Sequence, residues 1–208
     1  MNLNTAHAKS YIKGLTDLAI KLIANPVDFF RTMPKSGGLL DPLFFILLTV
    51  LLSVALIAIE SFVSHGVGAR DLGMLAGGLI LVPLIVIILS FFMAGAFFAI
   101  WSFMGSSENL ETSYRCVAYT HIVIPVTIIL SIVPYLGLLG IAWWLYLMVI
   151  ASMEVHKVPA KHALLVFGII ALISGLVYYS SVSSAIKAKE HLQELTRELQ
   201  KMPGKSER

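Results

Sequence analysis

Apolar residues run almost without interruption from Pro42 to Val182, and only short polar loops divide them. A spanning helix needs about 20 mostly apolar residues to cross a hydrocarbon core of roughly 30 Å. Runs of about this length lie at residues 42–63, 72–104, 115–133, 136–154 and 160–182. The pattern therefore predicts an all-α, polytopic membrane protein with five transmembrane helices.

The second run, residues 72–104, is longer than one perpendicular span and short for two spans with a turn. At 1.5 Å per residue, one helix of this length reaches about 50 Å. The run contains Gly77, Gly78 and Pro83, which are residues that kink a helix. We favour one long kinked helix over a re-entrant hairpin, and the sequence leaves both open.

Residues 3–24 are predicted to form an N-terminal amphipathic helix. Its apolar residues recur at spacings of three and four, at Tyr11, Ile12, Leu15, Leu18, Ala19, Leu22 and Ile23. Lys9, Lys13 and Lys21 lie largely off that stripe. Such a helix suits the membrane interface, with its lysines near anionic headgroups, or it packs on the cytoplasmic end of the bundle.

Residues 25–41 connect this helix to the first span and are rich in proline and glycine. The aromatic pair Phe29 and Phe30 suits the level of the lipid headgroups, where aromatic side chains gather. We therefore expect Lys9, Lys13 and Lys21 to contact the membrane interface together with these two rings.

The tail, residues 183–208, carries an apolar seam with charged residues between its members. The seam consists of Ala185, Ala188, Leu192, Leu195, Leu199 and Met202. This heptad spacing predicts a C-terminal helical extension, continuous with the fifth span, that ends at Pro203. It forms either a short coiled coil between copies, through Leu192, Leu195 and Leu199, or a solvated or self-docked helix. The domain division is thus 1–41 for the head and connector, 42–182 for the bundle and 183–208 for the tail.

Basic residues set the predicted orientation. They gather in the head and in the loops at 105–115 and 154–162, whereas the other two loops carry only Arg70. Basic loops stay in the cytoplasm, so we expect a cytoplasmic N-terminus. Five spans then place the C-terminus outside, although the tail itself carries six basic residues.

Composition agrees with a membrane protein, because 58% of residues are hydrophobic and 13% are charged. A soluble domain has about 25% charged residues. Orientation and lipid contact account for the net charge of +3, so we do not expect nucleic-acid binding. The single cysteine, Cys116, excludes an intrachain disulfide and a cysteine metal cluster. Without a phosphate-binding loop, dinucleotide fingerprint or nucleophile motif, we expect no enzymatic activity, cofactor or metal.

Ionisable residues in or beside the spans form the candidate polar site. They are Glu60, His121, Glu154, His156 and His162. The last four belong to the cytoplasmic half in the predicted topology, where they would converge on a proton or ion site. In the simpler interpretation, Glu154 and the two loop histidines are solvated at the interface, and His121 bonds to a backbone carbonyl, Tyr119 or Glu154.

Residues 104–166 contain a polar small-residue loop, an R-x-x-x-Y start to the third span, a proline-glycine turn and a histidine loop before an alanine-rich span. This stretch resembles the Yip1 domain family in its prokaryotic form. The matching residues are Arg115, Tyr119, Pro125, Pro134, Gly137, Trp144, His156 and Ala163. Upstream, the resemblance continues at Pro26, Phe29, Phe30, Met33 and Pro42, so that it covers about residues 25–180.

The resemblance implies five spanning helices with a cytoplasmic N-terminus and, through the prokaryotic form of the family, a place in the inner membrane of a prokaryote. Eukaryotic members of the family are linked to small GTPases and vesicle trafficking. This chain has a shorter head and lacks their tyrosine-glycine motifs, so we do not transfer a GTPase partner. For prokaryotic members the resemblance implies a fold and no established chemistry.

The patterns support two hypotheses for function. In the first, the protein is a non-enzymatic membrane-organising or adaptor component that self-associates, with membrane lipids and other membrane proteins as partners. In the second, it is a small oligomeric channel or transporter with a pathway that involves Glu60 and His121.

Overall fold

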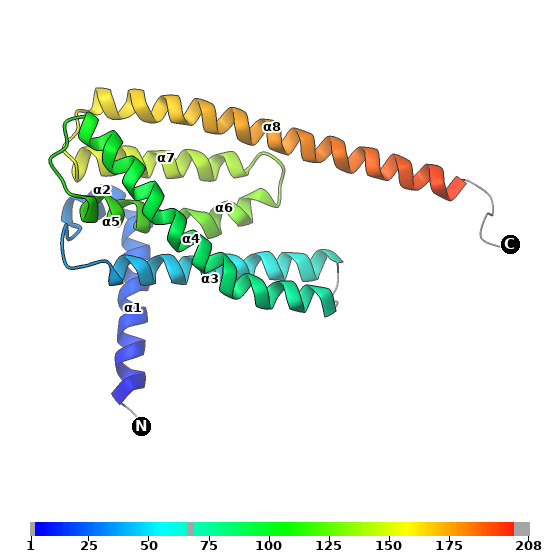
Figure 1. Ribbon diagram of the computed structural model, residues 1–208, viewed down its shortest axis with the longest axis horizontal. Helices are drawn as coiled ribbons and strands as arrows, with labels where there is room; N and C mark the ends of the chain where they lie inside the picture. The colour runs from blue at the N-terminus through cyan, green and yellow to red at the C-terminus, as the bar shows by residue number, and fades with distance from the viewer. Residues whose placement is uncertain (1–2, 66–68, 202–208) are drawn as a thin grey trace.

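The computed structural model describes residues 3–65 and 69–201, with the side chains of residues 13–63, 73 and 75–199. Every regular element in this part of the chain is a helix. The helices are α1 (Leu3–Ala24), α2 (Pro26–Thr32), α3 (Leu40–His65), α4 (Ala69–Phe103), α5 (Leu110–Thr120), α6 (Val123–Ser131), α7 (Gly137–Glu154) and α8 (Ala160–Lys201). Figure 1 shows α3, α6, α7 and α8 running along a common direction, with α4 crossing them obliquely.

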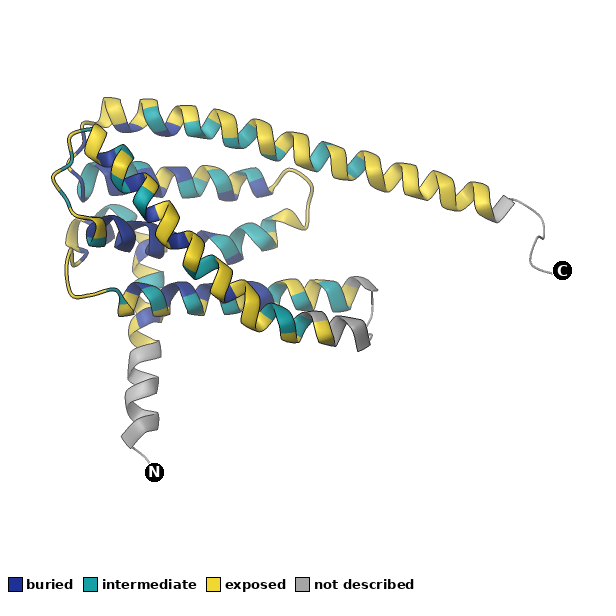
Figure 2. Ribbon diagram, viewed as in Figure 1, coloured by how far each residue is buried: buried dark blue, intermediate teal, exposed yellow. Residues whose placement is uncertain are grey.

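Five segments of the described chain are long and apolar enough to span a membrane. They are Leu40–Val63, Leu75–Phe103, Leu110–Leu130, Gly137–Glu154 and Ala160–Leu199. Exposed positions follow the outer faces of α4 and α8 (Figure 2), and large apolar side chains such as Phe92 and Leu172 occupy many of them. Apolar surface on this scale requires a lipid environment, so the prediction of an all-α, polytopic membrane protein is confirmed.

The second run forms a single helix, α4, which contains Pro83 in its interior. Figure 1 shows this helix changing direction along its length. Proline removes one helical hydrogen bond and its ring clashes with the carbonyl four residues earlier, which bends a helix. One long kinked helix is therefore correct, and the re-entrant hairpin is wrong.

The third run was predicted to form one transmembrane helix, and the structure divides it into α5 and α6 at His121 and Ile122. Pro125 explains the break, because it cannot donate to the carbonyl of His121, four residues earlier. The amides of His121 and Ile122 instead bond to carbonyls three residues earlier, on Ala118 at 3.2 Å and Tyr119 at 3.3 Å. The span still crosses the bundle, but as two helical pieces.

The amphipathic helix α1 has the predicted bounds. Leu15 and Leu22 are buried, whereas Lys13 and Lys21 are exposed, which confirms docking of its second half on the bundle. The side chain of Lys9 lies outside the described residues. Figure 1 shows α1 running across the direction of α3 and α7, an orientation that also suits a helix lying along the membrane surface.

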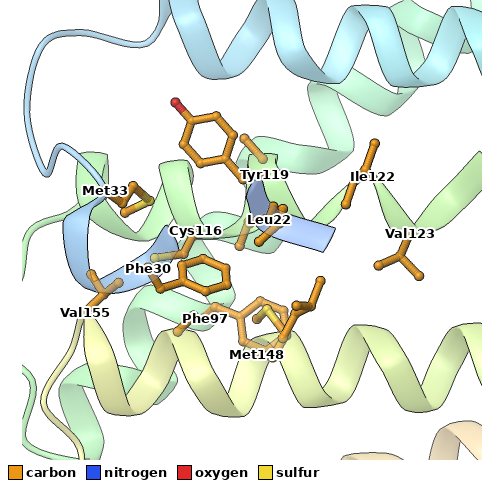
Figure 3. Packing of buried hydrophobic residues seen from close by; sticks show 14 of the residues in the cluster. Leu22, Phe30, Met33, Phe97, Cys116, Tyr119, Ile122, Val123, Met148 and Val155 are labelled. Carbon is orange, nitrogen blue, oxygen red and sulfur yellow. The ribbon is translucent and has the colours of Figure 1, made fainter. Parts of the chain in front are cut away.

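The core includes the region where α2, α5 and α7 meet, and Figure 3 shows Phe30, Cys116 and Met148 within it. Phe29 and Phe30 are only 3% and 1% exposed. The expected headgroup contact of these two rings is therefore wrong. Asn25 accepts a hydrogen bond from the amide of Asp28 at 3.1 Å and starts α2, which packs on α7 and carries both rings into the core.

The tail prediction is confirmed as far as the structure describes the chain. Helix α8 continues from the membrane segment to Lys201 without a break, and Figure 1 shows its end extending beyond the other helices. Leu192, Leu195 and Leu199 are 63%, 42% and 68% exposed. The self-docked alternative is wrong for these leucines, because docking would cover them.

Candidate functional site

A polar network lies at the end of the bundle where α2 meets the 104–109 and 155–159 loops, which we call the connector end. Arg31 of α2 donates to both carboxylate oxygens of Glu154, with Nε–Oε2 at 3.1 Å and Nη2–Oε1 at 3.0 Å. This hydrogen bond raises the pKa of Arg31 above its ordinary value. The bidentate geometry fixes α2 against the end of α7.

Lys35 forms a second bridge across the connector end. Its ammonium pairs with the Glu108 carboxylate and also donates to the carbonyl of Val155 at 3.3 Å. Its own backbone carbonyl accepts from the Thr112 hydroxyl at 3.0 Å. One connector residue thereby joins the loop before α5, the start of α5 and the loop after α7.

Arg115 is the most deeply buried basic residue of the described part, at 2% exposure. Its Nη2 donates to the carbonyl of Gly38 at 2.6 Å, and its Nε lies 3.5 Å from a carboxylate oxygen of Glu111. The same Glu111 oxygen accepts from the amide of Gly38 at 2.8 Å. Gly37 and Gly38 have φ of 122° and 84°, and a Cβ on Gly37 would lie 3.2 Å from Arg115 Nη2. The glycine pair therefore lets the connector backbone approach the guanidinium.

His156 lies beneath this network and is 3% exposed. Its ring stacks on Trp101, with centroids 3.8 Å apart. Its Nδ1 lies 2.9 Å from the Ser106 hydroxyl, and its Nε2 lies 3.8 Å from the sulfur of Cys116. Burial, reinforced by the charge of Lys35, lowers the pKa of His156 to about 3. The expectation of a solvated histidine is wrong here, because the ring is a neutral member of the core.

The five residues of the predicted polar site do not converge. Glu154 is held by Arg31, His156 is buried, and His162 is exposed at the start of α8, as expected for a solvated histidine. The Nδ1 of His121 lies 2.9 Å from the carbonyl of Val117, which confirms the backbone-bonded interpretation. Among the described residues, no three His, Cys, Asp or Glu side chains are grouped as ligands for a metal ion.

Glu60 belongs to a different feature, an open cavity of about 560 Å³ between α3, α6 and α7. The cavity is lined by Ile57, Glu60, Val123, Ile124, Thr127, Ile128, Ser131, Ile132, Gly140, Ile141 and Trp144. His121 is not among the lining residues, so the structure does not join Glu60 and His121 in one pathway.

Sequence reasoning missed the grouping of Arg31, Lys35, Glu108, Glu111 and Arg115 in one network. The signal that pointed to it was the Gly37-Gly38 pair upstream of a basic residue at the start of a span. Partners separated by 73 to 123 positions cannot be paired from spacing alone.

The model of the Yip1 domain matches residues 20–182. The match runs from the end of α1 to the membrane-spanning part of α8, and it includes the whole connector-end network. No match was found among curated proteins or among solved structures.

Proposed function

The chain belongs to the Yip1 domain family, and we propose that it acts as a non-enzymatic membrane-organising or adaptor component that self-associates through its tail. The observation that carries this proposal is the exposed leucine seam on the extended end of α8. The membrane-spanning bundle anchors the protein, and the tail offers the contact surface.

The last contacts that hold α8 to the bundle lie at the beginning of the tail. The hydroxyl of Tyr135, in the turn after α6, lies 3.4 Å from that of Ser183, and its ring stacks on Tyr179. Past this point the described tail is exposed along most of its length. A stripe of leucines on a solvated helix usually marks a contact site, and spacings of three and four suit a coiled coil.

The connector-end network supports a structural role for the polar residues that the family resemblance singled out. Arg115 and His156 are buried and engaged with the connector and the core. Their contacts hold the connector closed over the bundle. This arrangement favours an adaptor whose bundle keeps one shape.

We propose an N-terminus in the cytoplasm and a tail outside, in the inner membrane of a prokaryote, with membrane lipids and other membrane proteins as partners. Figure 1 places α2 and the end of α8 at opposite ends of the bundle, and exposed basic residues such as Lys157 and Lys161 lie at the connector end. Single cysteines at Lys13 or Gln193, in a Cys116→Ser background, test the orientation. Labelling of intact cells by a membrane-impermeant maleimide at position 13, and not at 193, would contradict it.

Self-association is tested by truncation after Val182, with the subunit number measured by light scattering in detergent. We expect the bundle to remain inserted and folded, and the subunit number to fall. Leu195→Glu should have the same effect, because it places a charge in the seam. Gln193→Glu, off the seam, is the matched control. If the subunit number is unchanged in both the truncated protein and Leu195→Glu, the contact between copies lies among the spanning helices and not in the tail.

The adaptor proposal also predicts no selective flux across a membrane. Purified protein in liposomes should leave ion and solute gradients intact. Reproducible flux that His121→Ala abolishes would overturn the proposal in favour of a channel or transporter.

A further inference from the structure

The cavity between α3, α6 and α7 lies in the half of the membrane away from the connector end. Glu60 follows the start of α3 by 20 residues, which corresponds to about 30 Å along a helix. Ser131 ends α6, and Gly140 belongs to the first turn of α7. These three positions therefore lie close to the far surface of the bilayer.

The lining of the cavity has an amphiphilic character. Most of it is isoleucine, valine and the ring of Trp144, and its polar side chains are Glu60, Thr127 and Ser131. Among the side chains that the structure describes, none of those lining the cavity is basic. The Thr127 hydroxyl donates its hydrogen to the carbonyl of Val123 at 2.8 Å. Its oxygen can therefore accept a hydrogen bond from a ligand but cannot donate one. An apolar ligand with a cationic, hydrogen-bond-donating end matches this surface.

The cavity opens on the face of the bundle that meets lipid, because its rim residues Ile57 and Ile132 are exposed. Its volume of about 560 Å³ falls within the range of known ligand pockets, about 300–1,000 Å³. We propose that it binds one phospholipid with a primary-amine headgroup. One acyl chain lies along Ile57, Ile124 and Trp144, and the ammonium group meets Glu60. A carboxylate offers about four acceptor sites, so the ammonium adds to the contacts that Glu60 already makes.

Close contacts join two of the helices that form the cavity, α6 and α7, and also join α7 to α8. A Cβ on Gly140 would collide with the Thr127 side chain, and a Cβ on Gly137 would collide with the hydroxyl of Tyr178. Small residues of this kind let helices approach closely in membranes. The cavity is therefore a preformed feature between α3 and a tightly joined α6–α7 pair.

Trp144 provides a direct measurement, because it lines the cavity. The variant used for this measurement carries Trp143→Phe, which removes the neighbouring fluorophore. Trp101 is fully buried in the core. It is reconstituted with phosphatidylethanolamine or phosphatidylglycerol whose acyl chains are dibrominated and otherwise identical. We expect the amine lipid to quench Trp144 at a concentration roughly two- to fivefold lower, the preference that an exposed ion pair supplies.

Glu60→Gln should remove this preference, whereas Glu194→Gln in the tail, a matched loss of charge, should keep it. Equal quenching by the two lipids, or a preference that survives Glu60→Gln, overturns the proposal. If Glu60→Gln fails to fold, Ile141→Phe tests the cavity by filling it, with Leu139→Phe on the exposed side of α7 as control. Quenching that Ile141→Phe leaves unchanged also overturns it.

A second copy of the protein is the competing occupant. Ile57→Cys in the Cys116→Ser background reports a two-fold contact at the cavity, because the introduced thiols of the two copies then meet and form an intermolecular disulfide on mild oxidation. Cross-linking at position 57, together with an unquenched Trp144, would mean that a second copy of the protein occupies the cavity and would overturn the lipid proposal.

Discussion

Arg115→Met is the perturbation that most directly tests the connector-end network. Methionine approximates the length of the side chain but removes the donor to the Gly38 carbonyl and the charge beside Glu111. A hydrogen bond to a charged group contributes about 1.5–3 kcal/mol, and its loss leaves the Gly38 carbonyl without this donor. Part of this cost is offset, because the substitution also removes the Nε of Arg115, which is buried without a hydrogen-bond partner.

We therefore expect the free energy of unfolding to fall by about 2 kcal/mol, measured by denaturant titration in detergent with tryptophan fluorescence. Glu111→Gln is the control, because an amide oxygen still accepts from the Gly38 amide and only the 3.5 Å ion pair is lost. Its cost should stay below about 1 kcal/mol. Hydrogen exchange at the Gly38 amide should accelerate more in Arg115→Met than in Glu111→Gln.

A change of less than about 0.5 kcal/mol in Arg115→Met would refute the reasoning. It would mean that the cost of burying the guanidinium cancels its bonds, as happens when a buried charge is replaced by a well-packed apolar side chain. Arg115 would then specify the position of the connector without stabilising it.

Two further predictions concern residues of the core beneath the connector. Phe30→Ala should lower the free energy of unfolding by about 3–5 kcal/mol, because the ring is 1% exposed. Phe92→Ala, on the lipid-facing side of α4, should change the free energy of unfolding little. Equal effects of the two substitutions in denaturant titrations would mean that the Phe30 ring contacts lipid. His156 keeps a pKa of about 3 in the folded protein, so only the unfolded state, with an imidazole pKa near about 6.5, takes up a proton as the pH falls through this range. Stability should therefore fall by about 2 kcal/mol between pH 6.5 and 5, and His156→Gln should flatten this dependence while His162→Gln leaves it.

The sequence predicted the helices because hydrocarbon thickness and helical period act on local stretches of chain. The runs at 136–154 and 160–182, and the continuation of α8 into the tail, needed no information about partners. The bounds of α1 could likewise be read from its apolar stripe and from Asn25-Pro26. The break at His121 was available in principle from Pro125, whose effect falls four residues earlier.

The candidate site was harder to predict because its members come from distant segments. Phe29 and Phe30 have the composition of an interfacial pair, and their burial depends on how α2 packs on α7. His156 lies in a polar loop, and only the stacking of Trp101 and the approach of Cys116 withdraw it from water. Side-chain type predicts a preference for an environment, whereas the packing of remote helices decides which environment is provided.

The two ends of the bundle differ in how their elements are joined. The connector end is fastened by Arg31, Lys35 and Arg115, so it has little freedom to admit a ligand. The far end carries the Glu60 cavity, and Figure 1 shows that α8 leaves the bundle there. A lipid at Glu60 and a partner at Leu192 would therefore occupy the same side of the membrane. Tyr135 lies between them, because it follows Ser131 of the cavity and contacts Ser183 of α8. The turn after α6 is consequently the element that joins the cavity to the beginning of the tail.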